Sequence, residues 1–207
     1  MKTKLLNQEG VEIWTVDLNE NVFDVSVNSW LIHRALVYQL ANDRQVVAHT
    51  KTRWERRWST RKIYRQKWTW RARMGSNRSP IRKKWWVAFG PRNNVNFTIS
   101  MNKKERRLAL FSVLTNKVKE NKLLILDKIV FNEIKTKNMV WVISKLPYER
   151  NILLATSWKD EVINKSSSNI PNLKTLDVSY LNISDLLKYK TLVLVWEALD
   201  KLNSLTR

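Results

Sequence analysis

Residues 44–92 limit what this chain can fold into more than any other feature of the sequence. This stretch carries sixteen lysine and arginine residues but one acidic residue, Glu55, so it holds fifteen of the chain's twenty net positive charges. Burying unpaired charges costs far more free energy than a small core returns, so the stretch cannot form a core. We therefore expect its partner to be a polyanion. The basic residues are Arg44, Lys51, Arg53, Arg56, Arg57, Arg61, Lys62, Arg65, Lys67, Arg71, Arg73, Arg78, Arg82, Lys83, Lys84 and Arg92.

The order of the charges indicates which polyanion is the partner, nucleic acid or an anionic membrane surface. A helix that lies on a membrane needs an apolar stripe opposite its charges. Here basic residues occur at every helical phase, mixed with Ser, Thr, Asn and Gln. This pattern is typical of an extended arm that contacts phosphates on several sides. A disordered basic linker is the alternative, although the internal position of the stretch argues against a tail.

The rest of the composition is ordinary for a single domain. With 207 residues, 43% of them hydrophobic, the chain can bury a real core. It has no cysteine and only two histidines, which excludes disulfides and thiolate or histidine-rich metal sites, and we expect no metal and no cofactor. The first ten residues lack an apolar signal region, and no window approaches 18 apolar residues. We expect a soluble, cytoplasmic protein.

Apolar periodicity predicts an α/β fold. Strands are expected at 11–18, 23–27, 123–126, 152–155, 173–178 and 191–195, and helices at 30–44, 103–121, 135–146, 159–165, 183–189 and 197–205. Short apolar strands between helices indicate a mostly parallel sheet with helices on both faces. We therefore predict one α/β globular domain over residues 1–207, interrupted by an extended RNA-binding loop at about 45–98.

The two helices that flank the basic stretch have predicted caps and buried faces. Asn28 or Ser29 can cap the first, and Asn102 can cap the second. In the first helix the apolar residues Leu31, Leu36, Val37 and Leu40 keep a helical period. In the second, the expected buried stripe is Leu108, Phe111, Leu114 and Val118. The second helix begins with Lys103, Lys104, Arg106 and Arg107, which oppose the helix dipole unless an external anion compensates them. We expect these four to extend the RNA-facing surface.

An α/β fold also invites a nucleotide-binding enzyme as a rival interpretation. A dinucleotide site needs Gly-x-Gly-x-x-Gly between a strand and a helix, because glycine lets the backbone approach the pyrophosphate. The three glycines lie at 10, 75 and 90, and no P-loop is present. Asp127, at the end of LLILD, could bind a ribose hydroxyl, but a polar residue at a strand end is more often a turn former. We expect no enzyme.

Residues 50–92, TKTRWERRWSTRKIYRQKWTWRARMGSNRSPIRKKWWVAFGPR, resemble the extended loop of the bacterial-type family of large-subunit ribosomal protein four. That family's motif runs T-K-T-R-G-E, then W-R-Q-K-G-T-G-R-A-R-x-G-S-x-R-S-P, then G-G-x-x-F-G-P. The match continues at 27–42, 102–114 and 169–202, so it covers nearly the whole chain. The RQKxTxRAR and xGSxRSP elements are specific, well beyond a chance basic run.

The resemblance implies a non-enzymatic structural constituent of the large ribosomal subunit that also supports subunit assembly. In that family a globular domain sits on the outer face of the subunit, and the loop threads through ribosomal RNA to the nascent-peptide exit tunnel. The implied partners are large-subunit ribosomal RNA, neighbouring ribosomal proteins and the nascent peptide, with no membrane. The alternative is a free-standing basic RNA-binding or ribosome-assembly protein on the same fold.

The resemblance and the charge pattern together assign two sets of site residues. The expected RNA-binding residues are Lys51, Arg53, Arg56, Arg57, Arg61, Lys62, Arg65, Gln66, Lys67, Arg71, Arg73, Arg78, Ser79, Arg82, Lys83, Lys84, Arg92, Lys103, Lys104, Arg106 and Arg107. The expected tunnel-facing tip is Tyr64, Arg65, Gln66 and Lys67. No residue is assigned a catalytic role.

Tryptophan replaces glycine at one motif position after another. The chain has 11 Trp but only 3 Gly, which inverts the usual proportion. Six of these tryptophans lie in the loop: Trp54, Trp58, Trp68, Trp70, Trp85 and Trp86. In one explanation the indoles are real and stack on unpaired bases. In the other, the gene comes from a bacterial lineage that reads UGA as glycine, and the printed sequence reads those codons as tryptophan. We favour the second, because glycine lets a backbone press against RNA.

Overall fold

The computed structural model describes residues 1–81, 87–131, 133–147 and 151–204, and its contacts divide the chain into two units. One unit joins Met1–Ala41 to Ile99–Arg207, and we call it the α/β unit. The other is Asn42–Thr98, which we call the basic segment. Each unit is described by itself below.

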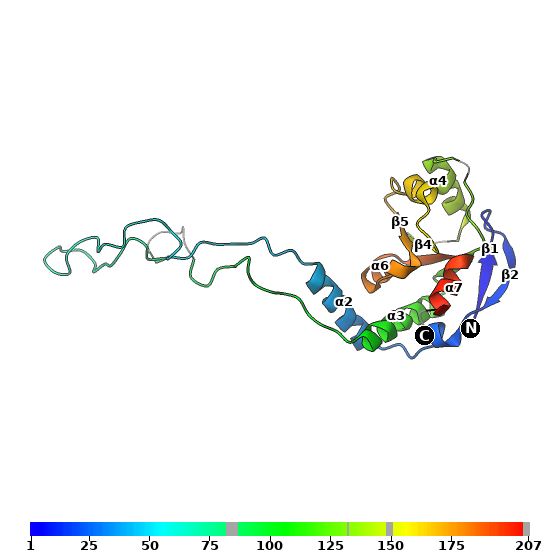
Figure 1. The fold of residues 1–207 in the computed structure, drawn as a ribbon, viewed down its shortest axis with the longest axis horizontal. Helices are drawn as coiled ribbons and strands as arrows, with labels where there is room; N and C mark the ends of the chain where they lie inside the picture. Colours follow the sequence, from blue (N-terminus) through cyan, green and yellow to red (C-terminus); the bar gives the residue numbers. More distant parts are fainter. Residues whose placement is uncertain (82–86, 132, 148–150, 205–207) are drawn as a thin grey trace. The chain divides into compact units, whose positions relative to one another are not determined.

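The α/β unit is built on a six-stranded sheet with the order β2-β1-β3-β6-β4-β5 (Figure 1). β1 and β2 pair antiparallel, whereas every other pairing is parallel. The sheet is therefore mixed and mostly parallel, in agreement with the predicted fold class. The strands are β1 (Lys2–Leu6), β2 (Glu12–Asp17), β3 (Leu123–Leu126), β4 (Ile152–Thr156), β5 (Leu173–Asp177) and β6 (Thr191–Val195).

Helices cover the central strands of this sheet. α3 packs against α1 and α6, α4 packs against α5, and Figure 1 shows α3 and α4 on opposite sides of the strands. Every residue of β4 and β6 is buried, which explains why these strands are continuous apolar runs. The helices are α1 (Glu20–Phe23), α2 (Ser29–Asp43), α3 (Lys103–Lys119), α4 (Thr136–Lys145), α5 (Glu161–Ser167), α6 (Ile183–Lys188) and α7 (Trp196–Ser204), with a 3-10 turn, η1 (Val178–Tyr180). Among the described residues, no helix has the length and apolarity needed to cross a membrane.

The N-terminal region departs most from the predicted elements. The strand expected at 23–27 is wrong, because Phe23 ends the short helix α1 and residues 24–28 form no strand. Asn19 caps this helix by accepting a hydrogen bond from the Asn21 backbone N–H at 3.1 Å, and Phe23 then points into the core. β1 was not predicted, since its sequence KTKLL has only two apolar residues. It pairs with β2 on one side and β3 on the other.

The two helices that flank the basic segment bury smaller residues than predicted. Of the apolar residues of α2 that keep a helical period, Leu31 is buried but Val37 and Leu40 are exposed, and the smaller Ala35 is buried as well. In α3, Leu114 is fully buried as expected, whereas Leu108 is 45% exposed. Small side chains at these contacts let helices approach closely, so the largest apolar residues did not mark the buried face. The remaining buried residues of α3 are Ala109, Ser112, Val113, Thr115 and Lys117.

Of the two predicted helix caps, one is supported by a side-chain hydrogen bond and the other is not. Asn28 accepts from the Leu31 backbone N–H at 3.1 Å, which confirms the cap of α2. Asn102 occupies the N-cap position of α3 without capping it, and its amide instead lies 3.4 Å from the Glu105 carboxylate. α5 begins two residues later than the predicted helix, because Asp160 accepts from the Val162 backbone N–H at 2.8 Å.

Candidate nucleic-acid interface

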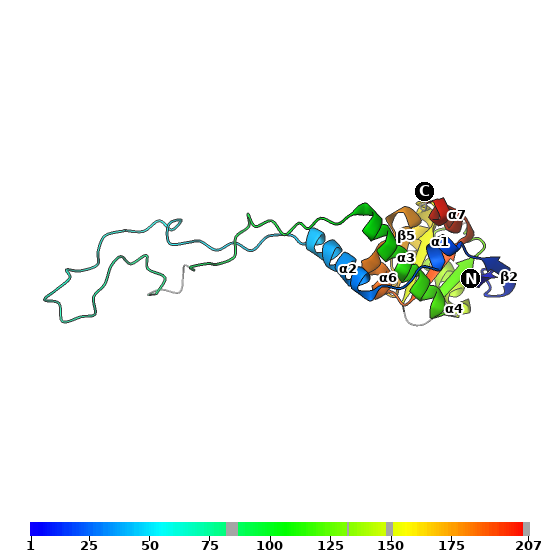
Figure 2. The ribbon, with the colours of Figure 1, turned by 90° about the horizontal axis from the view of Figure 1, so that it is seen from below.

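The basic segment consists of two limbs that run side by side (Figures 1 and 2). Thr50 on the first limb donates its backbone N–H to the Pro91 carbonyl at 3.0 Å, and Ile63 donates to the Gly75 carbonyl at 3.2 Å. After Asp43, the last residue of α2, its described residues form no helix and no strand beyond one isolated bridge, between Lys62 and Ser76. Most backbone polar groups here are therefore left for solvent or a partner to satisfy.

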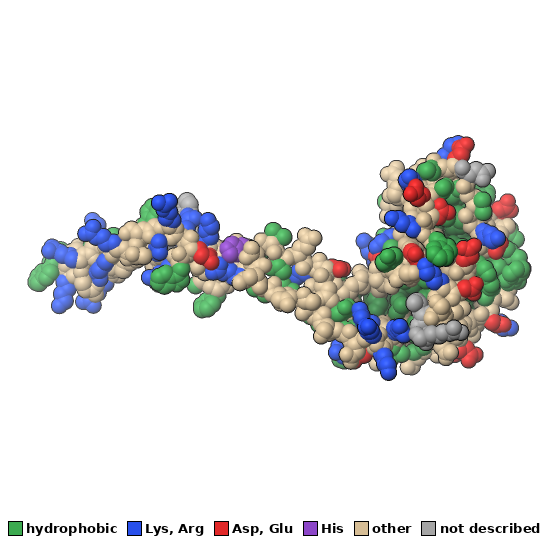
Figure 3. Space-filling model, viewed as in Figure 1, with side chains coloured by type: hydrophobic (Ala, Val, Ile, Leu, Met, Phe, Trp, Pro, Cys, Tyr) green, Lys and Arg blue, Asp and Glu red, His purple; other side chains and the backbone are tan. Residues whose placement is uncertain are grey.

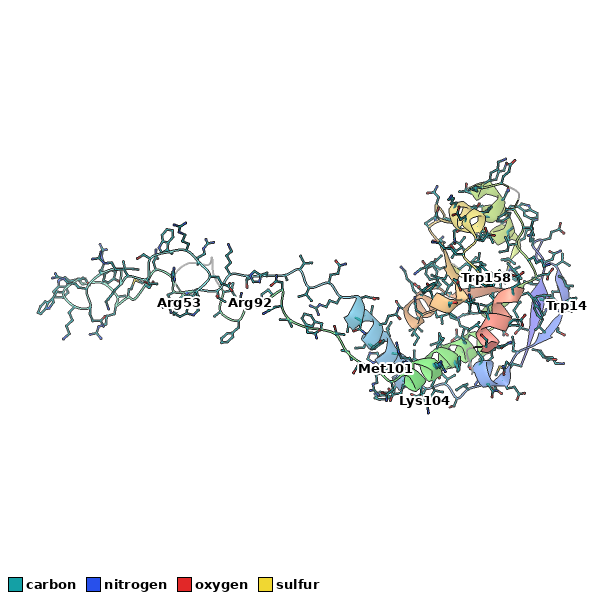
Figure 4. All side chains as sticks on the ribbon, in the orientation of Figure 1. Trp14, Arg53, Arg92, Met101, Lys104 and Trp158 are labelled. Carbon is teal, nitrogen blue, oxygen red and sulfur yellow. The ribbon has the colours of Figure 1, made fainter. Side chains whose placement is uncertain are left out.

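The only acidic residue of the stretch holds the two limbs together. The Glu55 carboxylate accepts the Thr52 backbone N–H at 2.9 Å and pairs with the Arg92 guanidinium at 2.5 Å. Both contacts lower the pKa of Glu55 below its ordinary value, and the backbone hydrogen bond from Thr52 has the larger effect. Figure 4 labels Arg92 and Arg53 on this part of the segment. Because Glu55 is engaged internally, it does not offset the other basic side chains.

Close packing between the limbs requires a glycine at position 90. A Cβ built on Gly90 would lie 2.1 Å from Oγ1 of Thr50, closer than any real Cβ contact. That hydroxyl also donates to the Pro91 carbonyl at 3.2 Å, so it cannot move away without losing a bond between the limbs. Gly90 belongs to the FGP element of the family motif and keeps its glycine.

The limbs join at a closed end between Tyr64 and Ala72. The Tyr64 hydroxyl donates to the Ala72 carbonyl, and the Arg65 guanidinium donates to the Trp68 carbonyl at 3.4 Å. The predicted tip residues Gln66 and Lys67 lie within this end. What these residues contact in an assembly stays a prediction.

Basic side chains line both limbs (Figure 3). Most of the predicted RNA-binding residues here are exposed, whereas Arg56, Arg78 and Arg92 are only partly exposed. Ser79 is also half-buried, in a turn where its backbone N–H bonds to the Ser76 carbonyl. The exposed ones are Lys51, Arg53, Arg57, Arg61, Lys62, Arg65, Gln66, Lys67, Arg71 and Arg73. Arg82, Lys83 and Lys84 lie outside the described residues.

Two of the anomalous tryptophans adopt a backbone conformation that favours glycine. Trp68 has φ of 66° and Trp70 has φ of 52°, in the left-handed region that bulky L-residues rarely enter. Their side chains are 75% and 99% exposed, so no packing within the described chain compensates for this conformation. Trp54 and Trp58 are exposed as well but have no positive φ. Trp85 and Trp86 lie outside the described residues.

The remaining predicted RNA-binding residues lie in the α/β unit, at the start of α3. Lys103, Lys104, Arg106 and Arg107 are all exposed there, and Figure 4 labels Lys104. The acidic residue of this turn, Glu105, pairs with Arg34 of α2 at 3.2 Å. The positive end of the helix dipole is thus reinforced by four cations, an arrangement that favours a bound anion.

Two contacts, one in each unit, were not predicted from the sequence. Arg106 lies over the ring of Tyr38, 5.4 Å from its centroid, and donates to its hydroxyl at 3.2 Å. Tyr38 follows the buried residues Leu31 and Ala35 at helical spacing, so the periodicity of α2 could have placed it on the inner face. The Thr50–Pro91 pairing had no local signal, because 41 residues separate the two.

The hollow beside Asp127 does not suit a nucleotide. It has a volume of about 360 Å³ and is bordered by Glu9 as well as Asp127, with Lys128 as its one basic lining residue. Two carboxylates would repel a phosphate group, and the N-terminal turn beside them has the single glycine Gly10 rather than a glycine-rich loop. The geometry therefore gives the enzymatic interpretation no support.

Comparison with known proteins gives matches along almost the whole chain. The model of the "Ribosomal protein L4/L1 family" matches residues 16–205. A protein named large ribosomal subunit protein uL4 from Caldicellulosiruptor saccharolyticus is 42% identical over 201 residues, covering 97% of this chain and 96% of the relative. Its namesake in Dehalococcoides mccartyi is 42% identical over 205 residues, covering 99% and 97%. That of Syntrophomonas wolfei is 39% identical over 201 residues, covering 97% of each.

Proposed function

Because the chain belongs to the ribosomal protein L4/L1 family, we propose that it is a structural, non-enzymatic constituent of the large ribosomal subunit in the cytoplasm. In this role it binds large-subunit ribosomal RNA and contacts neighbouring ribosomal proteins. The relatives carry the name of a large-subunit protein and align over nearly their full length, which supports an equivalent role here.

The observation that carries this proposal is the charge of the basic segment. Residues 44–92 hold sixteen basic residues, and the only acidic one, Glu55, is bound by Thr52 and Arg92 within the segment. The exposed cations along both limbs can each neutralise a phosphate. Their spread over two limbs suits RNA that surrounds the segment rather than a flat membrane surface.

The finer part of the proposal concerns the closed end of the segment. We infer that the segment extends through ribosomal RNA as a loop and supports assembly of the subunit. The end between Tyr64 and Ala72 then reaches the exit tunnel and meets the nascent peptide. The family resemblance supports this placement, and the basic residues Arg65, Lys67 and Arg71 at that end suit a wall made of RNA.

We also propose that the positions of Trp68 and Trp70 are glycine in the cellular protein. Both have positive φ, and both lie where the family motif has glycine. Reassignment of UGA to glycine accounts for both observations and for the other tryptophans at motif glycines. Intact-protein mass spectrometry of the native product tests this, because each Trp-to-Gly difference lowers the mass by a fixed amount. A mass that matches the printed sequence would contradict it.

Salt dependence tests whether the basic segment binds the RNA. The logarithm of affinity for protein-free large-subunit ribosomal RNA should fall by about 0.7 to 0.9 for each unit of log salt per phosphate contact. Deleting residues 44–92 should flatten this slope strongly, whereas a deletion variant with an unchanged slope would place the RNA site on the α/β unit. A free-standing RNA-binding protein is the alternative function, and loss of the chain from large subunits during a high-salt wash would favour it.

A further inference from the structure

The α/β unit contains a groove of about 450 Å³ that the basic segment does not line. Its walls come from α2, α3 and α6, which lie close together in Figures 1 and 2. Tyr38, Phe111 and Ile183 supply apolar and aromatic surface inside it. Lys103, Arg106 and Arg107 border the same groove from the first two turns of α3.

We propose that this groove receives one unstacked base of the bound ribosomal RNA, with the flanking phosphates against Lys103 and Arg107. The inference rests on the proposed function, because it assumes that the chain binds this RNA. It goes further by assigning a base-binding role to Tyr38 of α2, a residue outside the charged surface.

The surface chemistry of the groove suits a base better than a phosphate alone. A phosphate needs only hydrogen-bond donors and positive charge, both of which the exposed start of α3 already offers. A groove with aromatic and apolar walls matches the face of a base, and proteins recognise splayed RNA bases by such stacking. Its volume lies within the usual range of sites for small molecules, roughly 300 to 1,000 Å³.

Tyr38 is held in place before any RNA binds. Arg106 donates to its hydroxyl at 3.2 Å and lies 5.4 Å from its ring centroid. Fixing the ring in advance lowers the entropy that binding costs. Gln39 beside it uses Oε1 to accept the Ser184 backbone N–H at 3.1 Å, which leaves its amide nitrogen as a donor for the edge of a base.

Charge argues for RNA over a peptide as the occupant. Three basic side chains line the groove, and no Asp or Glu is found among its described lining residues. Asn182 also lines it, but both ends of its amide are used by Asp185 at 2.8 Å, so it caps α6 and does not select a ligand. A partner here must therefore be anionic and must carry a flat apolar face.

Ultraviolet cross-linking of the full-length chain to protein-free large-subunit ribosomal RNA tests the proposal directly. Tryptic peptides that carry a nucleotide are identified by mass spectrometry, and Tyr38 falls in the peptide of residues 35–44. We expect a nucleotide on this peptide at Tyr38. Absence of that adduct, while the basic segment cross-links, would overturn the proposal and leave the proposed function intact. Failure of the unmodified chain to bind the RNA at all would overturn the proposed function itself.

Substitutions at Tyr38 and Arg107 distinguish the contribution of base stacking to RNA affinity from that of charge. Tyr38→Leu should weaken RNA binding by about 5- to 150-fold, the range expected for losing one base–aromatic stack, without changing the salt slope. Tyr38→Phe keeps the ring and should retain both the cross-link and most of the affinity. Arg107→Gln should instead lower the salt slope by about 0.7 to 0.9, the value of one phosphate contact.

Tyr180 provides a matched control for Tyr38. It lies in η1 between two residues that line the groove, but it is 74% exposed and lies outside the lining itself. Tyr180→Leu should leave affinity and cross-linking unchanged. Equal affinities for Tyr38→Leu and Tyr180→Leu would contradict the base-binding role. In intact subunits, a chemical cross-link from this groove to another ribosomal protein would likewise contradict it.

Discussion

Replacing Trp68 and Trp70 by glycine should improve assembly of the protein into ribosomes. At φ of 66° and 52°, both residues occupy the left-handed region, which costs a residue other than glycine about 1 to 2 kcal/mol. For the pair the penalty is about 2 to 4 kcal/mol, paid when RNA fixes the segment in this conformation. Because 1.4 kcal/mol corresponds to a tenfold change in an equilibrium constant, even about 2 kcal/mol would favour the glycine version roughly 30-fold.

Base stacking by the two indoles would act against the strain, so the version that is enriched shows which effect is larger. If the two exposed indoles stack on bases, removing them would cost about 1 to 3 kcal/mol per base, and the tryptophan version would win. The assay mixes both versions and measures their ratio in newly assembled large subunits by mass spectrometry. Enrichment of the glycine version is expected.

Trp54 is the matched control for this experiment. It is 74% exposed in the same segment but has no positive φ, so Trp54→Gly removes an indole without relieving backbone strain. We expect that change to give much less enrichment. Equal incorporation of the double variant and the original, or preference for the original, would refute the strain argument and support base stacking.

Three further predictions concern the basic segment. Without RNA, limited trypsin digestion should cut within about 46–98 before it cuts the α/β unit, because like charges and the lack of apolar periodicity disfavour folding there; protection would contradict this. The pKa of Glu55 is lowered, so its contacts stabilise the limb pairing above its ordinary pKa of 4.5 and are lost as pH falls through the lower folded value; an NMR titration of the Thr52 amide should show this transition. Gly90→Ala should separate the limbs and weaken RNA binding, whereas Gly75→Ala, with no atom within 4 Å of its Cβ, should be tolerated; equal effects on RNA affinity would refute the packing argument.

The centre of the sheet could be predicted because β4 and β6 are buried along their whole length. β4 and β6 read as uninterrupted apolar runs between helical segments, which only a covered parallel strand requires. β1 carries Lys2 and Lys4 on an N-terminal strand with little apolar content, and its pairing with β2 and β3 has no local signal. A strand was expected here because Phe23, Val25 and Val27 alternate with polar residues, whereas α1, capped by Asn19, ends at Phe23 and no strand follows it.

Only the charged residues of the candidate site could be predicted from the sequence, and its contacts between distant residues could not. The basic residues of the segment follow from composition, since so many cations without acids need an anionic partner. The pairing of Thr50 with Pro91 and the contact of Tyr38 with Arg106 join residues far apart in sequence, so periodicity could not reveal them. The positive φ of Trp68 and Trp70 was foreseen only indirectly, through the glycines of the family motif.

Sedimentation of ribosomes from the cells that make this protein tests the central claim most directly. Lysate is separated on a high-salt sucrose gradient, and peptides of the chain are quantified in each fraction against those of known large-subunit proteins. The account predicts one copy per large subunit, retained through the wash. Recovery of the chain mainly at the top of the gradient, or in amounts far below one copy per subunit, would contradict it.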